Sequence, residues 1–316
     1  MTPRRVENHR DRLRDSTGLM IGVASVWEAT ARKVGNVHRK ADFADTTYLD
    51  FVLSALAVSD AWGKDEADPT AVFGSSVGNA VDATRALVDR NTNLGIILAV
   101  RPLAAVRPVA EKRNPNFGGR YDLRAGVRTV LDRLTVTDAR RVFDAIFSAR
   151  PGGLGDAPEQ DVKYEPTVPL LDAMKLAADR DMIARQYANG YADVFDFGVP
   201  AFLAAFKKFG RVEPAIVECH LAWMAEFPDS LIARKNGLPA AEDVQRRVKH
   251  VLSLGGLDTP EGRAAGVALD RHLRSDSNKL NPGTSADLVA ACLYVALREG
   301  KITPNAPFAW DAEDWL

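Results

Sequence analysis

Apolar residues recur every three or four positions along almost all of this chain. The pattern begins with Met20, Val23, Val26 and Trp27 and returns at Tyr48 and beyond. Such spacing places the apolar side chains on one face of an α-helix, where they can pack against a core. Alternation with period two, typical of a half-buried β-strand, does not extend over a strand's length anywhere in the sequence. The sequence therefore predicts an all-α fold.

The chain shows no break in composition and no internal repeat, which favours a single multi-helix globular domain over residues 1–316. Within it we distinguish a polar N-terminal segment, residues 1–16, and an acidic, aromatic tail, residues 303–316. The tail either binds a partner or packs its tryptophans against the body of the protein. Further helices are expected over residues 72–88, 94–106, 123–134, 138–147, 170–185, 201–209, 215–227, 241–254, 260–273 and 285–298.

Three of the expected helix starts carry capping signals. Thr259 precedes a proline, which predicts an N-cap followed by proline at the first helical position. Thr47 with Asp50, and Thr284 with Asp287, have the spacing of a capping box, in which two side chains satisfy each other's backbone N–H groups.

The charges of the chain nearly cancel, with 41 Lys and Arg against 42 Asp and Glu. Such a chain has no overall field that attracts a nucleic-acid backbone or an anionic bilayer. No run of about 18 apolar residues predicts a membrane span, and the N-terminus lacks the apolar region of a signal peptide. We expect a cytoplasmic protein whose partners are small molecules, not nucleic acid and not a membrane. Its oligomeric state stays open between a monomer and a homodimer.

The two cysteines, Cys219 and Cys292, lie in apolar helical patterns and are expected to be buried, reduced thiols. His220 is read as a core or boundary histidine rather than a metal ligand. No Walker loop, Rossmann glycine fingerprint, nucleophile elbow or zinc motif occurs in the sequence. The long Pro/Gly-rich loop over residues 150–169 is either a lid or a surface excursion.

The first polar segment with chemical potential follows Glu28 and ends at Arg39. Lys33, Arg39 and their basic neighbours surround Gly35, whose missing side chain lets the backbone approach a ligand. Together with Asn36, this turn predicts a binding site for a polyphosphate. The alternative is a basic helix end completed by a glycine cap.

A second polar segment, formed by Asn91, Thr92 and Asn93, opens a very apolar helix. One such side chain is enough to cap a helix. Because three are supplied, we predict that they also meet phosphate oxygens at the positive helix end. Capping alone is the alternative.

A third segment begins at Asp229 and ends with Arg234 and Lys235. A carboxylate and two cations in one short helical turn can hold Mg²⁺ through Asp229 and phosphate through the cations. The alternative is a capped turn with an exposed ion pair.

The fourth segment places Gly283, Thr284, Ser285 and Asp287 at the start of an apolar helix. Hydroxyls and a carboxylate at a helix start can contact a substrate. For Asp287, however, the capping box is a sufficient explanation by itself.

In their order along the chain, these segments resemble the triphosphoribosyl-dephospho-CoA synthase family, also called ATP:dephospho-CoA triphosphoribosyltransferases. The similarity covers nearly the whole chain. The family's glutamate helix and PKPGxVxR turn are matched by Glu28, Lys33, Gly35, Val37 and Arg39. Its NTxxG, LMA…DT…R.G and PGGSADLLA segments are similar to Asn91, Thr92 and Gly95, to Met224, Ala225, Asp229, Arg234 and Gly237, and to residues 282–290.

The resemblance implies an all-α enzyme that moves a 5-triphosphoribosyl group from ATP to the ribose 2′-hydroxyl of 3′-dephospho-CoA and releases adenine. Breaking the N-glycosidic bond builds oxocarbenium character on the sugar. One carboxylate can stabilise that charge and a second can accept the proton of the attacking hydroxyl, with Glu28, Asp229 and Asp287 as the candidates. The triphosphate implies Mg²⁺, for which Glu28 and Asp229 are candidate ligands, and cations such as Lys33 and Arg234.

Two departures from the family pattern indicate a divergent subgroup. Asn93 and Leu94 stand where other members read NTHKG, so a histidine and a lysine are absent. Arg32 and Val34 replace the two prolines of PKPG. Two alternatives therefore stay open: an enzyme of one-carbon carrier (methanopterin-type) cofactor biosynthesis acting on another phosphorylated substrate, and a non-catalytic nucleotide-binding helical protein.

Overall fold

The computed structural model describes residues 15–67, 72–108 and 121–316. These residues form fourteen α-helices and one π-helix and contain no β-strand, so the expected all-α fold is confirmed. The helices are α2 (Thr17–Thr30), α3 (Tyr48–Ala67), α4 (Phe73–Val88), α5 (Leu94–Ala104), α6 (Leu123–Leu131), α7 (Val136–Ala149), α8 (Leu170–Ala177), α9 (Met182–Asn189), η1 (Val194–Gly198), α10 (Val199–Phe209), α11 (Val212–Glu226), α12 (Ser230–Asn236), α13 (Leu238–Ser253), α14 (Pro260–Arg274) and α15 (Gly283–Arg298).

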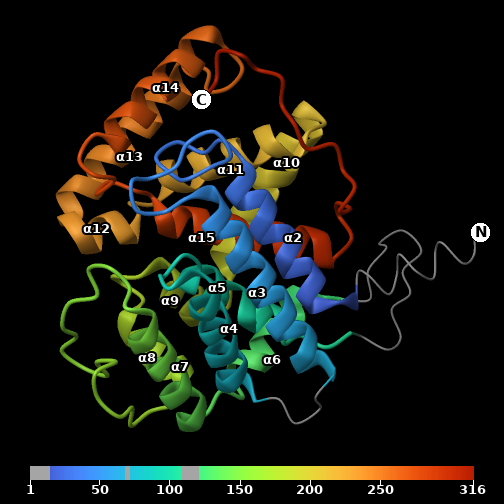
Figure 1. The fold of residues 1–316 in the computed structure, drawn as a ribbon, viewed down its shortest axis with the longest axis vertical. Helices are drawn as coiled ribbons and strands as arrows, with labels where there is room; N and C mark the ends of the chain where they lie inside the picture. The colour runs from blue at the N-terminus through green and yellow to red at the C-terminus, as the bar shows by residue number, and fades with distance from the viewer. Residues whose placement is uncertain (1–14, 68–71, 109–120) are drawn as a thin grey trace, which may run out of the picture.

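Helix α15 lies at the centre of the molecule (Figure 1). Every residue from Leu288 to Arg298 is buried, because α15 packs against α2, α5, α10 and α11 on different sides. A helix that is apolar all round is stable only when neighbours cover its whole surface. The start of α15, which carries the fourth polar segment, is thereby fixed in the middle of the fold.

Helix α5 contains a proline that links it to α9. Pro102 has no N–H, so the carbonyl of Leu98 lacks its usual helical donor. The Tyr187 hydroxyl donates to this carbonyl at 2.8 Å, and the Tyr191 hydroxyl donates to the carbonyl of Ala99 at 2.8 Å. These two buried bonds hold α9 and its following turn against α5.

The C-terminal tail packs on a second, smaller core formed by α11, α13 and α14. Trp315 is buried, and a side chain at Gly266 of α14 would overlap its ring. The Trp310 ring lies 6.1 Å from that of Trp315. Of the two readings of the tail, the structure therefore shows the one in which its tryptophans pack against the body of the protein.

Some helix limits differ from those expected. The single helix expected over residues 170–185 is two helices, because the Asp181 carboxylate accepts from the Ile183 and Ala184 N–H groups at 2.9 and 3.0 Å and starts α9. Helix α13 begins at Leu238, not at residue 241, and residues 1–14 of the polar N-terminal segment lie outside the described part of the chain.

Two capping predictions are confirmed and one is wrong. Thr259 caps α14 through the Gly262 N–H, and Thr47 and Asp50 form the reciprocal pair. The Thr284–Asp287 box does not form, because α15 already begins at Gly283 and takes no side-chain cap. The Asp287 carboxylate is therefore free of the role that would have explained it without a ligand.

Cys219 and Cys292 are both buried and form no disulfide, as expected. None of the helices in the described residues combines the length and the apolar character that a bilayer crossing requires.

Candidate functional site

A cavity of about 1050 Å³ opens where the four polar segments meet. Its lining includes Glu28 at the end of α2, Asn91 before α5, Arg234 on α12 and Asp287 on α15. These positions are far apart in the sequence and converge because α15 lies between α2, α5 and α12. A concave site of this size can hold a nucleotide together with a second ligand.

The predicted site residues divide into two sets. The cavity is lined by Glu28, Asn36, Asn91, Thr92, Asn93, Arg234, Lys235, Gly283, Thr284 and Asp287. The lining does not include Lys33, Gly35, Arg39, Asp229 and Ser285. The second set lies behind the cavity wall and shapes it.

Glu28 and Lys33 form a buried ion pair at the end of α2. The Lys33 Nζ lies 2.9 Å from the Glu28 Oε1, and their side chains are 0% and 5% exposed. The same ammonium also donates to the carbonyls of Glu28 and Ala31. The Lys33 charge is thus neutralised inside the protein, and Lys33 holds Glu28 in place at the cavity.

The turn after Lys33 is anchored to α14 and to the start of α15. Gly35 has φ +71° and its N–H donates to the Asp270 carboxylate at 2.7 Å. A Cβ at Gly35 would lie 2.9 Å from Pro282, so this close approach requires glycine. Asn36 continues the contact, because its Oδ1 accepts from the Asn281 amide at 2.8 Å.

His220 lies directly behind this turn and is fully buried. Its Nε2 is 3.1 Å from the Asn36 amide nitrogen. Burial, with the nearby Lys33 charge, lowers the pKa of His220 to about 3. A neutral imidazole in this place positions Asn36 and carries no charge for a phosphate.

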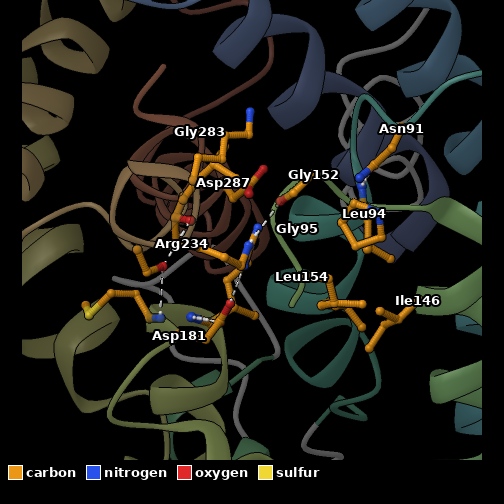
Figure 2. Close-up of a pocket in the computed structure, with 18 of the residues that line it drawn as sticks. Asn91, Leu94, Gly95, Ile146, Gly152, Leu154, Asp181, Arg234, Gly283 and Asp287 are labelled. Atoms are coloured by element: carbon orange, nitrogen blue, oxygen red, sulfur yellow. Dashed lines mark hydrogen bonds and ion pairs between the residues drawn. The ribbon is translucent and has the colours of Figure 1, made fainter. Parts of the chain in front are cut away.

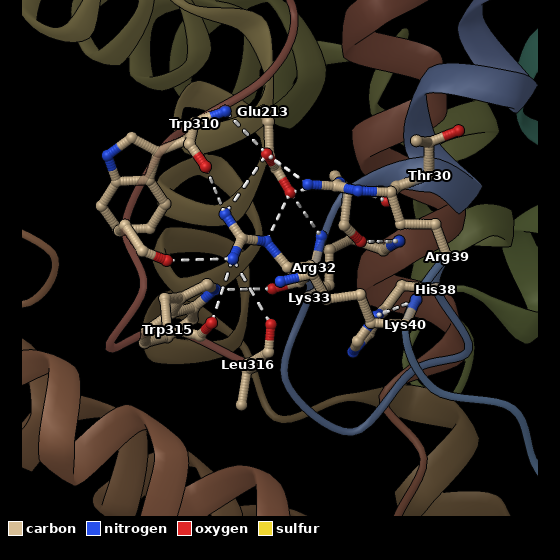
Figure 3. A network of polar contacts seen from close by, with 12 residues as sticks. Thr30, Arg32, Lys33, His38, Arg39, Lys40, Glu213, Trp310, Trp315 and Leu316 are labelled. Atoms are coloured by element: carbon tan, nitrogen blue, oxygen red, sulfur yellow. Dashed lines mark hydrogen bonds and ion pairs between the residues drawn. The ribbon is translucent and has the colours of Figure 1, made fainter.

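Arg32 and Arg39 meet at one buried carboxylate, that of Glu213 on α11 (Figure 3). Arg32 donates to Glu213 at 2.8 Å and also to the carbonyls of Trp310 and Trp315 at 2.7 and 3.0 Å. Arg39 donates to both oxygens of the same carboxylate. Both cations thereby tie the turn to α11 and the tail, and neither lines the cavity.

The segment before α5 is held by its own polar contacts. The Asn91 Oδ1 accepts from the Leu94 N–H at 3.1 Å, so Asn91 has the helix-capping role that was the alternative to phosphate binding. The Thr92 hydroxyl bonds the Ser54 hydroxyl at 2.5 Å, and the Asn93 amide donates to the Ser54 carbonyl at 3.3 Å. All three residues nevertheless line the cavity.

Asp229 is the N-cap of α12 and faces the protein interior. Its Oδ1 accepts from the Leu231 and Ile232 N–H groups, and its Oδ2 accepts from the Ser285 N–H and hydroxyl, both at 2.8 Å. Burial raises the pKa of Asp229, against the lowering effect of these hydrogen bonds. With each oxygen engaged twice, Asp229 fixes the start of α12 against the start of α15.

Arg234 connects α12 to two segments that sequence reasoning did not assign to the site. Its Nη1 lies 3.0 Å from the Asp181 Oδ2, and its Nε donates to the Gly152 carbonyl at 3.2 Å (Figure 2). Lys235 follows it, and burial, together with the Arg234 charge, lowers the pKa of its ammonium. These two cations stand at the cavity where a phosphate can reach them.

Asp287 lines the cavity and has no protein partner in the described part of the chain. Within the described residues, no hydrogen bond or ion pair reaches it. A side chain at Gly95 of α5 would overlap the Asp287 carboxylate, so the two helices approach here only because residue 95 is glycine. Burial raises the pKa of Asp287 well above its ordinary value, and the Glu28, Asp229 and Asp181 charges add to this effect.

The sequence reading left two parts of the cavity wall unassigned. The loop after α7 lines it with Gly152, Leu154 and other residues up to Val162, so this long loop covers the site. The length of this loop and its glycines were the sequence features that could have assigned it to the site. Asp181 carried none, because a helix start inside a segment expected to be one helix is not visible from periodicity alone.

This chain is similar to proteins of one enzyme family. The model of the ATP:dephospho-CoA triphosphoribosyl transferase family matches residues 15–305. Relatives named as probable 2-(5''-triphosphoribosyl)-3'-dephosphocoenzyme-A synthases include one from Pseudomonas savastanoi pv. phaseolicola, 32% identical over 36% of this chain, and one from Vibrio cholerae, 36% identical over 39%. The aligned parts span 39% and 43% of the lengths of these relatives.

A solved structure from Archaeoglobus fulgidus, described as a triphosphoribosyl-dephospho-CoA synthase, is also similar. It superimposes with a TM-score of 0.59 at 26% identity and covers 78% of this chain and 98% of its own. Since the family model spans nearly all of the described helices and the solved relative shares the fold, this chain belongs to the ATP:dephospho-CoA triphosphoribosyl transferase family.

Proposed function

We propose that this protein transfers a 5-triphosphoribosyl group from ATP to a hydroxyl of 3′-dephospho-CoA or a related acceptor and releases adenine. One observation carries the proposal. In a chain of this family, Glu28 and Asp287 face the same cavity as the cations Arg234 and Lys235. Carboxylates for a sugar cation and cations for a polyphosphate are the two groups that this reaction needs together.

The Glu28 carboxylate stands where a positive charge on the ribose would be stabilised. As the N-glycosidic bond breaks, the sugar acquires oxocarbenium character, and a fixed negative charge in a site shielded from water lowers the energy of that state. The ion pair with Lys33 holds the Glu28 side chain before the substrate arrives. The cost of orienting it is therefore met during folding and not during the reaction.

The triphosphate is proposed to bind between α12 and the start of α15. Arg234 and Lys235 supply charge there, and Gly283 and Thr284 belong to the first turn of α15, where the helix dipole is positive. Leu94, Leu154 and Ile146 also line the cavity (Figure 2). These apolar side chains suit an uncharged ring or chain of a ligand whose other end carries phosphates.

The residues present do not fit the Mg²⁺ site expected from Glu28 and Asp229. The Asp229 oxygens accept four protein hydrogen bonds, and the Glu28 carboxylate is paired with Lys33. In the part of the chain that the structure describes, no group of three or more acidic, His or Cys side chains could hold an ion. We propose instead that Mg²⁺ enters as part of the substrate, on the phosphates of Mg·ATP.

The test is a direct assay for adenine. The purified protein is incubated with Mg·ATP and 3′-dephospho-CoA, and free adenine is measured by chromatography, with ATP alone as the blank. Adenine formed only when the acceptor is present supports the transfer. Tight binding of Mg·ATP, with no adenine released from ATP in the presence of any acceptor, would instead indicate a non-catalytic nucleotide-binding protein. Because the reaction consumes ATP, we propose the cytoplasm as its location.

A further inference from the structure

Glu28 and Asp287, two of the carboxylates that line the cavity, have opposite surroundings. Glu28 is paired with a buried ammonium at 2.9 Å. Asp287, at the same cavity, is approached by no cation or N–H within hydrogen-bonding distance among the described residues. Two acids in such different environments can take different roles in one reaction.

We propose that Asp287 is the general acid of the reaction and passes its carboxyl proton to a ring nitrogen of adenine as the base leaves. This assignment rests on the proposed transferase function. It differs from the roles of charge stabiliser and hydroxyl base that the sequence offered for this residue. Adenine is a poor leaving group as an anion, so a proton delivered to its ring is the largest contribution that a nearby acid can make.

The charged groups around Asp287 favour a proton on its carboxyl. Glu28 on α2, Asp229 before α12 and Asp181 before α9 are all acidic, and their effect adds to that of burial. Arg234 on α12 is the opposing charge, and it is already engaged by Asp181 at 3.0 Å. The Lys33 ammonium is paired with the Glu28 carboxylate. The net field at Asp287 therefore opposes its ionisation.

The proton transfers balance over one reaction cycle. The C1′–N9 bond breaks with its electron pair going to the base, and the Asp287 proton moves to a ring nitrogen, so neutral adenine leaves. The acceptor hydroxyl oxygen then forms the new bond to C1′ and becomes a strongly acidic oxonium. Its proton passes to solvent water, and the Asp287 carboxylate takes a proton back from water, so that it is again the acid. No oxidant, reductant or further reactant is consumed.

Gly95 makes this arrangement possible. Any side chain at residue 95 would overlap the Asp287 carboxylate, while the α5 backbone at this position has no positive φ that would itself require glycine. The glycine of the NTxxG segment is thus explained by the space that the acid occupies.

The decisive experiment compares two donors that share the 5-triphosphoribosyl group and differ in the base that leaves. ATP loses adenine, which must be protonated, whereas the 5′-triphosphate of nicotinamide riboside loses a pyridine that leaves neutral without a proton. We expect Asp287→Asn to lower kcat with ATP by about 10²- to 10⁴-fold. With the nicotinamide donor we expect less than about a tenfold loss, since general acid catalysis is not needed there. Equal losses with both donors would overturn the assignment.

A second measurement reads the proton directly and does not need turnover. Infrared spectra of the protein at neutral pH are expected to show a protonated carboxyl band that Asp287→Asn removes. In Glu28→Gln, which lacks the negative charge with the largest effect on Asp287, the same band should titrate away at lower pH than in the wild type. An active enzyme in which Asp287 is ionised contradicts only the acid role. A wild-type protein that releases no base from either donor removes the proposed function and this assignment together.

Discussion

The sequence Arg-Lys-x-Gly occurs twice, at residues 32–35 and at residues 234–237. The cations of the first copy are buried in ion pairs, and those of the second line the cavity. Arg32 and Lys33 are 1% and 0% exposed and bind buried carboxylates. Arg234 is partly exposed at the cavity, and Lys235 beside it also lines the site. The lesson is that a cation next to a glycine becomes a ligand-binding group only when no buried acid has already taken its charge.

The largest expected effect is a loss of stability when Glu213, the acid that pairs with both Arg32 and Arg39, is removed. Glu213→Ala leaves Arg32 and Arg39 without their counter-charge, and breaking a buried pair from one side costs about 3–5 kcal/mol. Urea unfolding should show this loss in the free energy of unfolding. Glu218→Ala, on the same helix but in a surface pair with Lys208, is the matched control and should cost no more than about 1 kcal/mol. Similar losses in the two variants would mean that the turn is not anchored at Glu213.

The next effect concerns the cavity side of the comparison. Gly95→Ala should lower kcat for adenine release by about a hundredfold, because the new methyl group displaces the Asp287 carboxylate. Gly78→Ala in α4 is the control, since a Cβ there meets nothing within 4 Å. In that variant kcat should be unchanged and the protein slightly more stable, as alanine favours a helix. Full activity of Gly95→Ala would show that the position of Asp287 is not critical.

A matched pair of arginine variants tests the comparison itself. Arg234→Gln should raise the KM for Mg·ATP by about tenfold or more, as expected for a lost charge-assisted contact, with little change in stability. Arg39→Gln should lower the free energy of unfolding and leave the KM for Mg·ATP unchanged, because Arg39 binds Glu213 and does not line the cavity. Steady-state kinetics and urea unfolding of both proteins decide the matter. A rise in KM for Arg39→Gln, with stability unchanged, would return Arg39 to the phosphate site.

The last expected effect is a pH dependence of stability that originates at the turn. Burial, followed by the Lys33, Arg274, Arg39 and Arg32 charges, lowers the pKa of His38 to about 3. The unfolded chain binds this proton below about pH 6.5 and the folded protein does not, so stability falls as the pH drops from about 6.5 towards 3. One histidine contributes a slope of up to about 1.4 kcal/mol per pH unit. His38→Asn should flatten the slope measured by urea unfolding, and an unchanged slope would contradict a neutral His38.

Much of the fold was predictable because helix periodicity and caps are local. The Thr259 cap and the Thr47–Asp50 box formed where their spacing indicated. The Thr284–Asp287 box failed because Pro282 and Gly283 start α15 earlier, so that Asp287 lies in the helix with its carboxylate at the cavity. Local spacing alone cannot distinguish these two cases, since both satisfy the same sequence pattern.

The candidate site was predictable as a set of segments but not as a set of roles. Asp229 has the sequence context of a metal ligand, yet its four hydrogen bonds come from backbone and side-chain groups of α12 and α15. Asp181 and Gly152 had no motif to mark them, although both contact Arg234 at the cavity. Hydrogen-bond partners from other helices decide such roles, and they are not visible in one segment.

The sequence by itself determined that the chain is helical, that four polar segments interrupt the helices, and that their order is the order of one enzyme family. The tertiary structure alone decided which Arg-Lys-x-Gly copy faces the cavity. The reason is that Glu213, the acid that binds Arg32, lies 181 residues further along the chain and is brought to the turn only when α11 packs beside α2. Electrostatic pairing acts through space, and a cation that is paired with a buried acid is no longer available to bind a ligand.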